Sequence, residues 1–213
     1  MENVLERIGS MGIIPVVAID DIAHCSELGY ALIEGGLPCV EVTFRTALAA
    51  DAIEALSTAH PSLLVGAGTV LTVSQAQTAI DAGASFVMAP GFDHDVVDWC
   101  LDKQVPIFPG VMTPTDINGA RNKGVKVVKF FPAEASGGVK TLKAVSGPYA
   151  DMQFVPTGGV NPNNLSDYLT LPFVLACGGT WILKKTKIVN SDFDAITETV
   201  REAVQIVMQT RSG

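Results

Sequence analysis

Short apolar runs alternate with longer segments of mixed polarity along the whole chain. Eight such runs recur at a steady interval, and each has the length and composition of a buried strand. They cover residues 13–19, 39–44, 63–68, 85–90, 105–109, 125–131, 152–157 and 173–178. The segments between them have helical periodicity. The pattern therefore predicts eight consecutive strand–helix units.

Helix-end signals support this division of the chain. Thr72 suits the N-cap of a helix that Gly83 closes, and Thr113 precedes a proline and Asp116 in the order of a capping box. The last helix is expected to begin at Ser191. Its apolar residues fall on one stripe, formed by Phe193, Ile196, Val200, Val204 and Val207.

Eight strand–helix units without a linker or a break in composition predict an α/β fold, a single (β/α)8 barrel domain over residues 1–213. The residues before Ile13 are expected to form a short helix that closes the barrel floor. A doubly wound open sheet is the alternative, although no G-x-G-x-x-G sequence follows the first run. This barrel hosts many chemistries, so the function must be argued from individual side chains.

Composition and charge restrict the possible partners. Of the 213 residues, 48% are hydrophobic and 17% are charged, so the chain can bury a sizeable core. The net charge of −8 disfavours nucleic acid, whereas a few cations in a cleft still suit a small anionic substrate. No signal-peptide pattern and no apolar run of membrane-spanning length is visible. We therefore expect a cytoplasmic protein without a nucleic-acid or membrane partner.

The cysteines and histidines are far apart and lack the spacing of metal ligands. They are Cys25, Cys39, Cys100, Cys177, His24, His60 and His94. Because no C-x-x-C pair occurs, reduced structural thiols are expected rather than disulfides. We predict no metal and no cofactor.

Polar side chains alternate with apolar ones along the second run. Glu41, Thr43 and Arg45 share a face that would point into the barrel, and the sixth run places Lys129 and Phe131 inward in the same way. Barrel enzymes carry out their chemistry at the carboxyl ends of their strands, so these charged residues are candidates for catalysis. A buried Glu41–Lys129 ion pair that only holds the interior together is the alternative.

Glycine pairs follow the last two strand-like runs, at Gly158-Gly159 and at Gly178-Gly179. Glycine lets backbone N–H groups approach an anion closely, and the loops after strands seven and eight of this barrel commonly bind phosphate. A tight turn explains either pair alone, but the two together predict a phosphate site. The lysine-rich segment 184–187 is expected to be a solvated loop.

Six segments, in order over nearly the whole chain, carry a family resemblance. They are Glu-Val-Thr-Phe-Arg-Thr at 41–46, Gly-Ala-Gly-Thr-Val-Leu at 66–71, Lys-Phe-Phe-Pro-Ala-Glu at 129–134, Gly-Gly-Val-Lys at 137–140, Pro-Thr-Gly-Gly-Val at 156–160 and Gly-Gly-Thr-Trp at 178–181. The third segment is highly specific. Together they resemble the 2-keto-3-deoxy-6-phosphogluconate (KDPG) aldolases, also called 4-hydroxy-2-oxoglutarate (KHG) aldolases.

The resemblance implies a class I aldolase that cleaves KDPG to pyruvate and glyceraldehyde 3-phosphate, and also hydroxy-oxoglutarate to pyruvate and glyoxylate. It implies Lys129 as the Schiff-base amine and Glu41 as the acid/base. The keto-acid site would be lined by Arg45, Thr69, Pro90 and Phe131. The far hydroxyls and the phosphate would be held by Thr157, Gly158, Gly159, Gly179 and Thr180. The family is usually a homotrimer, and a homotrimer is expected here.

Two positions depart from the family pattern. Thr180 stands where serine is commoner, which bears on phosphate affinity, and Phe44 stands where leucine is commoner. Two rival functions remain at this point. An isomerase or epimerase on the same barrel would explain the glycine pairs but leave Lys129 without a use, and a non-catalytic binding module would leave Lys129 inert.

Overall fold

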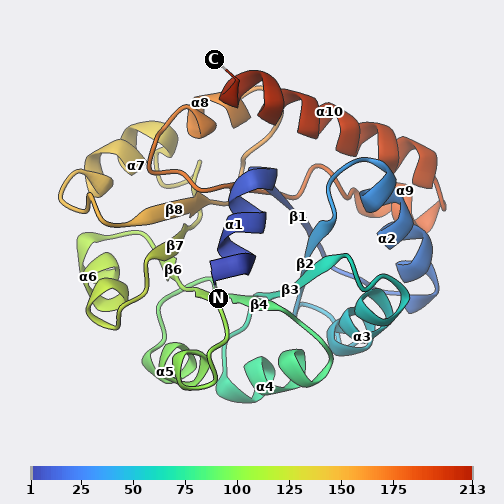
Figure 1. The fold of residues 1–213 in the computed structure, drawn as a ribbon, viewed down its shortest axis with the longest axis horizontal. Coiled ribbons are helices and arrows are strands. Elements are labelled where there is room, and N and C mark those ends of the chain that lie inside the picture. The colour runs from blue at the N-terminus through green and yellow to red at the C-terminus, as the bar shows by residue number, and fades with distance from the viewer. Residues whose placement is uncertain (1, 213) are drawn as a thin grey trace.

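The computed structural model describes residues 2–212 as a ring of parallel strands surrounded by helices (Figure 1). The strands are β1 (Ile13–Val17), β2 (Cys39–Thr43), β3 (Leu64–Gly68), β4 (Phe86–Met88), β5 (Ile107–Phe108), β6 (Gly110–Val111), β7 (Val127–Phe130), β8 (Gln153–Pro156) and β9 (Cys177–Gly179). The helices are α1 (Glu2–Met11), a 3-10 turn (Ile22–His24), α2 (Cys25–Glu34), α3 (Ala49–Ala59), α4 (Val73–Asp81), α5 (His94–Asp102), α6 (Pro114–Asn122), α7 (Gly138–Ser146), α8 (Leu165–Leu169), α9 (Lys185–Val189) and α10 (Phe193–Arg211).

The strands form two hydrogen-bonded sets that together close the ring. One set has the order β5-β4-β3-β2-β1-β9 and the other β6-β7-β8. The fifth strand of the ring extends beyond the predicted run 105–109 and is interrupted at Pro109, which has no N–H to donate, so β5 pairs with β4 and β6 pairs with β7. Single bridges at Phe154–Val174 and Thr157–Gly178 join β8 to the chain around β9. The predicted (β/α)8 barrel is confirmed, and the open-sheet alternative is wrong.

The inside of the ring holds a cluster of apolar side chains drawn from all around it, here called the floor layer. The layer consists of Ile14, Cys39, Leu64, Phe86, Met88, Phe108, Val127, Val155 and Ala176, with Ile8 from α1. Helix α1 lies across this end of the ring, as predicted (Figure 1). A second, larger cluster fills the space between the outer face of the strands and the helices. The polar residues predicted to point inward lie beyond this floor layer, toward the carboxyl ends of the strands.

Two of the three predicted helix starts have the predicted capping residue. The Thr72 hydroxyl accepts from the Gln75 N–H, and the Asp116 carboxylate accepts from the Thr113 N–H at 2.9 Å within a capping box. The last helix differs from the prediction, because Asp192 rather than Ser191 is its N-cap. Ser191 has a left-handed backbone (φ 54°) and cannot take the cap conformation, whereas the Asp192 carboxylate accepts from the first turn.

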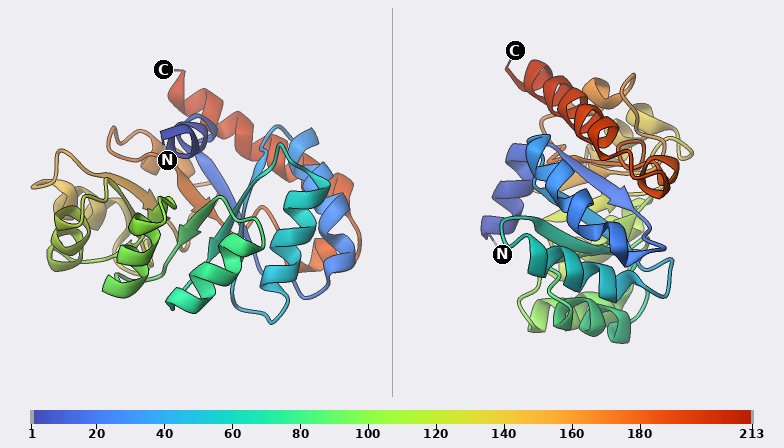
Figure 2. Two further views of the ribbon diagram at one scale, coloured as in Figure 1. Left: turned by 60° about the horizontal axis from the view of Figure 1, so that its bottom comes forward. Right: turned by 90° about the vertical axis from the view of Figure 1, so that its right-hand side faces the viewer.

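The helices cover the outside of the ring, and α10 runs along α2 and α8 (Figure 2). The segment predicted as a solvated lysine loop is instead the short helix α9. Its Lys187 ammonium donates to the Ala195 carbonyl at 2.9 Å and to the Thr199 hydroxyl at 2.7 Å, which ties α9 to α10. None of the helices between residues 2 and 212 is long and apolar enough to cross a membrane.

Candidate active site

Lys129 and Glu41 meet inside the barrel from opposite sides of the ring. Lys129 comes from β7 and Glu41 from β2, and the lysine ammonium donates to Glu41 Oε1 at 3.0 Å. Both residues are buried, with exposed fractions of 4% and 0%. Removing two charges from water costs several kcal/mol per ion, so a barrel built only for stability would place apolar residues there. The sequence prediction that both side chains point inward is confirmed.

Only one oxygen of the Glu41 carboxylate is used by this contact. Its second oxygen, Oε2, is buried and has no hydrogen-bond partner within residues 2–212. A buried carboxylate oxygen is stabilised by a hydrogen-bond donor, and its desolvation is costly otherwise. Glu41 Oε2 can therefore accept a hydrogen bond from a substrate group that enters the barrel mouth beside Lys129.

An aromatic ring borders the lysine, and a threonine follows the neighbouring strand β8. The Lys129 Nζ lies 5.6 Å from the centre of the Phe131 ring, within cation–π range. Phe131 and Pro90 both line a hollow of about 310 Å³ at the carboxyl ends of the strands. Directly after β8, Thr157 is buried, and its backbone N–H donates to the Phe130 carbonyl. The structure therefore brings three of the predicted substrate-binding residues to one end of the barrel with Lys129.

The two predicted glycine loops lie side by side. Thr157, at the start of the first loop, forms a bridge with Gly178 of the second. Gly158 and Gly159 have φ values of 99° and 83°, which favour glycine. Gly158 also packs on the active-site ring, because a Cβ atom there would lie 3.4 Å from Phe131 Cδ2. The loops are thus adjacent to each other and to the keto-acid end of the site.

Two residues that support this loop were given no role from the sequence. The Glu134 N–H donates to the Gly158 carbonyl at 3.0 Å, and the Glu134 carboxylate accepts from the hydroxyl of Tyr168 on α8. Tyr168 is fully buried, and this burial, followed by the hydrogen bond to Glu134, raises the pKa of its hydroxyl. Glu134 lies in the family-specific segment 129–134, and this is the sequence feature that could have indicated a role for it. In the sequence alone, Tyr168 cannot be distinguished from an ordinary apolar residue of a helix.

The remaining predicted residues lie at the rim of the barrel. Arg45 is exposed and lies two residues beyond the end of β2 at Thr43, so the alternation of strand faces does not fix the direction of its side chain. Thr69 directly follows β3 with a left-handed backbone (φ 57°), and Thr180 is exposed after β9. Gly179 packs against Trp181, whose ring would lie 2.5 Å from a Cβ atom at position 179.

The other titratable groups offer little competing chemistry. All four cysteines are buried and free, and burial raises the pKa of Cys25 to about 11 and that of Cys100 to about 12. These thiols are therefore poor nucleophiles at neutral pH. No three His, Cys, Asp or Glu side chains in the described part of the chain are grouped so that they could hold a metal ion.

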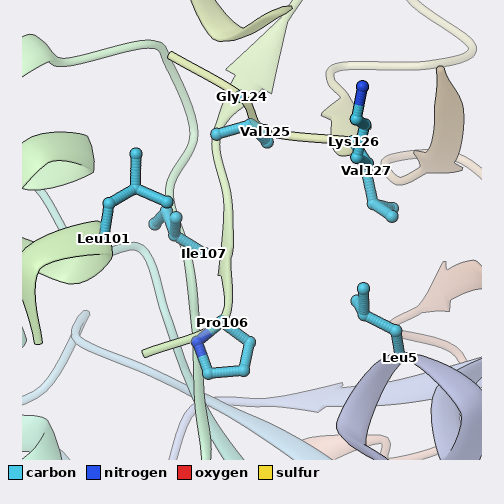
Figure 3. A pocket seen from close by; sticks show the side chains of 8 residues that line it. All are labelled: Leu5, Leu101, Pro106, Ile107, Gly124, Val125, Lys126 and Val127. Carbon is cyan, nitrogen blue, oxygen red and sulfur yellow. The ribbon is translucent and has the colours of Figure 1, made fainter. Parts of the chain in front are cut away.

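A separate pocket of about 110 Å³ lies at the opposite end of the barrel (Figure 3). It is lined by Leu5, Leu101, Pro106, Ile107, Gly124, Val125, Lys126 and Val127. The lining is almost entirely apolar, and the Lys126 ammonium points away from the hollow (Figure 3). The pocket offers no group for acid–base or covalent chemistry, so the carboxyl-terminal end of the barrel is the candidate active site.

Comparisons with known proteins point to one family. Residues 4–199 match the family model described as KDPG and KHG aldolase. The chain is 46% identical to the 2-dehydro-3-deoxy-phosphogluconate aldolase of Treponema pallidum, with 97% of this chain and 99% of that protein covered. It is 40% identical to the KHG/KDPG aldolase of Escherichia coli, with 91% of each covered.

A solved structure adds chemical information. The KDPG aldolase of Legionella pneumophila, determined with pyruvate captured as a covalent carbinolamine intermediate, is 36% identical and superposes with a TM-score of 0.89 over 92% of this chain and 96% of that one. A carbinolamine is the first adduct of an amine with a ketone. The chemistry captured in that protein is thus the chemistry that a buried lysine can perform.

Proposed function

The chain belongs to the KDPG and KHG aldolase family and is a class I aldolase, and we propose that Lys129 is the amine that forms its Schiff base. Its reaction is the cleavage of KDPG to pyruvate and glyceraldehyde 3-phosphate. We propose that it also cleaves hydroxy-oxoglutarate to pyruvate and glyoxylate. Membership of this family excludes the isomerase and the non-catalytic barrel. The observation that carries the assignment of Lys129 is its burial in hydrogen-bond contact with Glu41.

Schiff-base formation begins with a proton transfer. An amine attacks a carbonyl only in its neutral form, and the 3.0 Å contact gives the ammonium proton a direct route to Glu41. The neutral Lys129 Nζ then adds to the C2 carbonyl of the keto acid and forms a carbinolamine. Loss of water, with a proton donated to the departing hydroxyl by Glu41, gives the iminium.

Cleavage follows from the positive charge of the iminium. Removal of the C4 hydroxyl proton by the Glu41 carboxylate lets the C3–C4 bond break, and its electron pair moves to the iminium nitrogen. The aldehyde leaves and an enamine remains on Lys129. Glu41 returns its proton to C3, which gives the pyruvate imine, and water releases pyruvate from the lysine.

We assign the rest of the substrate to the rim residues. Phe131 and Pro90 would lie against the pyruvyl end, with Arg45 and Thr69 at the carboxylate. The distal hydroxyls and the phosphate would be bound by Thr157, Gly158, Gly159, Gly179 and Thr180. The bridge between the two glycine loops supports this assignment, because loops held side by side can both donate backbone hydrogen bonds to one phosphate group.

We further propose a single catalytic domain over residues 1–213 that acts in the cytoplasm as a homotrimer, without a nucleic-acid or membrane partner. We also propose that no metal or other cofactor is required, because the iminium is itself the electron sink that a metal would provide. Activity should therefore survive prolonged dialysis against a chelator. A loss of activity that zinc or magnesium restores would contradict this proposal.

Borohydride reduction in the presence of pyruvate tests the assignment of the amine. The reduced imine is a stable adduct, and peptide mass spectrometry should find it on Lys129. Lys126 and Lys140 are internal controls, since both are exposed and neither lies in the barrel interior. An adduct on either of these, or no adduct, would overturn the assignment.

A further inference from the structure

The carboxyl group of Glu41 lies against the backbone of Gly68 on the neighbouring strand. In the β2–β3 register, Glu41 is opposite Gly66, and Gly68 is opposite Thr43. An ideal Cβ atom on Gly68 would nevertheless lie 2.0 Å from Glu41 Oε1, 2.6 Å from Cγ and 2.7 Å from Cδ. The glutamate therefore leans along the strand direction, and its carboxyl group occupies the space that a side chain at position 68 would take.

Close approach, and not backbone conformation, is the reason for glycine here. The φ angle of Gly68 lies outside the left-handed region, so an L-residue could adopt its backbone without strain. The atom closest to the missing Cβ is Oε1, which is also the oxygen that binds the Lys129 ammonium at 3.0 Å. The space left by the missing side chain at position 68 is thus occupied by the same carboxylate oxygen that contacts Lys129.

We propose that Gly68 is a positioning residue for catalysis, because the lack of a side chain there holds the Glu41 carboxylate in contact with Lys129. The inference rests on the function proposed above and assigns that site a residue that does not touch the substrate. A methyl group at position 68 would force the carboxyl group about 1 Å away, since Cβ contacts under 3.0 Å do not persist. Misplacement of a reacting group by about 1 Å can cost roughly 10²-fold in rate.

Strand β3 offers a matched control two residues away. Gly66 also faces the interior, and a Cβ atom on it would lie 2.1 Å from Cζ of Phe86, a residue of the apolar floor layer. Gly66→Ala and Gly68→Ala therefore add the same methyl group to the same face of the same strand. The first crowds a floor side chain, and the second crowds the acid/base. Correction for the folded fraction removes any loss of stability from both comparisons, so a difference that remains reports on the acid/base.

The experiment compares imine formation with proton transfer in the full-length protein. Imine is measured by borohydride trapping of pyruvate on Lys129, and proton transfer by exchange of the pyruvate methyl protons in deuterated water, each corrected for the folded fraction. For Gly68→Ala we expect exchange to fall about 100-fold while the adduct on Lys129 is still obtained. For Gly66→Ala we expect both quantities to stay within a few-fold of the parent protein.

Removal of the acid provides a second test. Glu41→Ala lacks Cγ, Cδ and both carboxyl oxygens, so it lacks the three atoms that a methyl group at position 68 would meet. Glu41→Ala alone should slow exchange, because the acid/base is gone, and the exchange that remains no longer depends on the carboxyl group. Adding Gly68→Ala to Glu41→Ala should therefore change exchange by less than threefold, far from the 100-fold effect next to Glu41. This comparison also decides the matter if Gly68→Ala alone does not fold.

The outcomes separate this inference from the proposed function. Multiplicative effects in the double variant, or exchange in Gly68→Ala that matches Gly66→Ala, would overturn the positioning role while an adduct on Lys129 still supported the aldolase assignment. Failure of the parent protein to form any adduct on Lys129 would instead overturn the assignment of the amine itself.

Discussion

Gly159 lies directly against the side chain of Glu134. A Cβ atom at position 159 would lie 2.5 Å from Cβ and 2.6 Å from Cγ of Glu134, and the backbone there has a φ of 83°. The Glu134 carboxylate in turn accepts a hydrogen bond from the buried Tyr168. Helix α8 therefore fixes the side chain on which the first glycine loop rests. A change in the shape of this loop should therefore weaken binding of the phosphate end of the substrate.

The first prediction concerns this loop. Gly159→Ala should raise the KM for the phosphorylated substrate by about tenfold to a hundredfold, in line with the ~1–3 kcal/mol cost of overpacking. Cleavage of hydroxy-oxoglutarate, which has no phosphate, should change little. Steady-state kinetics with both substrates measure the difference.

Gly124 gives a control with the same backbone conformation. Its φ is also 83°, but no atom lies within 4 Å of a Cβ there, and it lies at the opposite end of the barrel. Gly124→Ala carries the strain without the contact, so it should leave the ratio of the two activities unchanged. Equal losses on both substrates in Gly159→Ala would show that the loop supports only the fold.

The alternation of polar and apolar residues predicted much of the fold and the centre of the site. A period of two fixes which face a strand residue occupies, and this placed Glu41 and Lys129 inside the barrel. The pattern could not predict that the two would touch. Their contact joins positions 88 residues apart, and its length depends on the reach of both side chains and on ring closure.

Other features depended on packing that a linear pattern does not contain. The inward direction of Arg45 stays a prediction, because a periodic rule does not show where a strand ends and β2 ends two residues before it. The proposed role of Gly68 could not be predicted from the sequence, because a glycine in a strand is usually interpreted only as a residue of weak strand propensity. Tyr168 looked like any apolar helix position, since its hydroxyl finds its partner 34 residues earlier in the chain.

The second prediction separates stability from activity at the buried pair. Lys129→Met leaves the Glu41 carboxylate unpaired and should lower the free energy of unfolding by about 3–5 kcal/mol. Adding Glu41→Met replaces the pair by flexible apolar side chains of similar length and should recover most of that stability. Neither variant should cleave substrate. Urea unfolding and activity assays test this, and a double variant as unstable as the single one would contradict it.

The third prediction concerns pH and the capping box of α6. Burial acts to raise the pKa of Asp116, but hydrogen bonds from the Met112 N–H, the Thr113 N–H and the Thr113 hydroxyl outweigh it, so the folded-state pKa is lowered. A lowered pKa stabilises the fold above the unfolded value of about 3.9, and this stabilisation is lost as the pH falls through the lower folded value.

Asp116→Asn should therefore cost about 1 kcal/mol at pH 7, a typical value for a weakened cap. The difference from the parent protein should begin to shrink as the pH falls below about 4, where the carboxylate of the unfolded chain becomes protonated, and should be lost below the lower folded-state pKa, where the folded carboxylate is protonated as well. Denaturant unfolding at a series of pH values measures it. A stability difference that stays constant down to acidic pH would show that the carboxylate charge contributes nothing to the cap.

The last prediction divides the role of Glu41 into steps. Glu41→Gln keeps the size and most of the hydrogen bonding of the side chain but removes its basic oxygen. Pyruvate should still bind, and some imine should still be trapped on Lys129, although it should form more slowly. Exchange of the pyruvate methyl protons needs only the imine and a base. It should fall by roughly the 10²–10⁴-fold typical of a lost acid–base group.

Aldol cleavage by Glu41→Gln should fall by a comparable factor, because protonation of the enamine uses the same carboxyl group. A purely structural role predicts a different result. The variant would then lose several kcal/mol of stability, as expected for a broken buried pair, and its exchange rate would follow the folded fraction. Thermal unfolding and proton exchange on the same sample distinguish the two, and a stable variant with normal exchange would remove Glu41 from the mechanism.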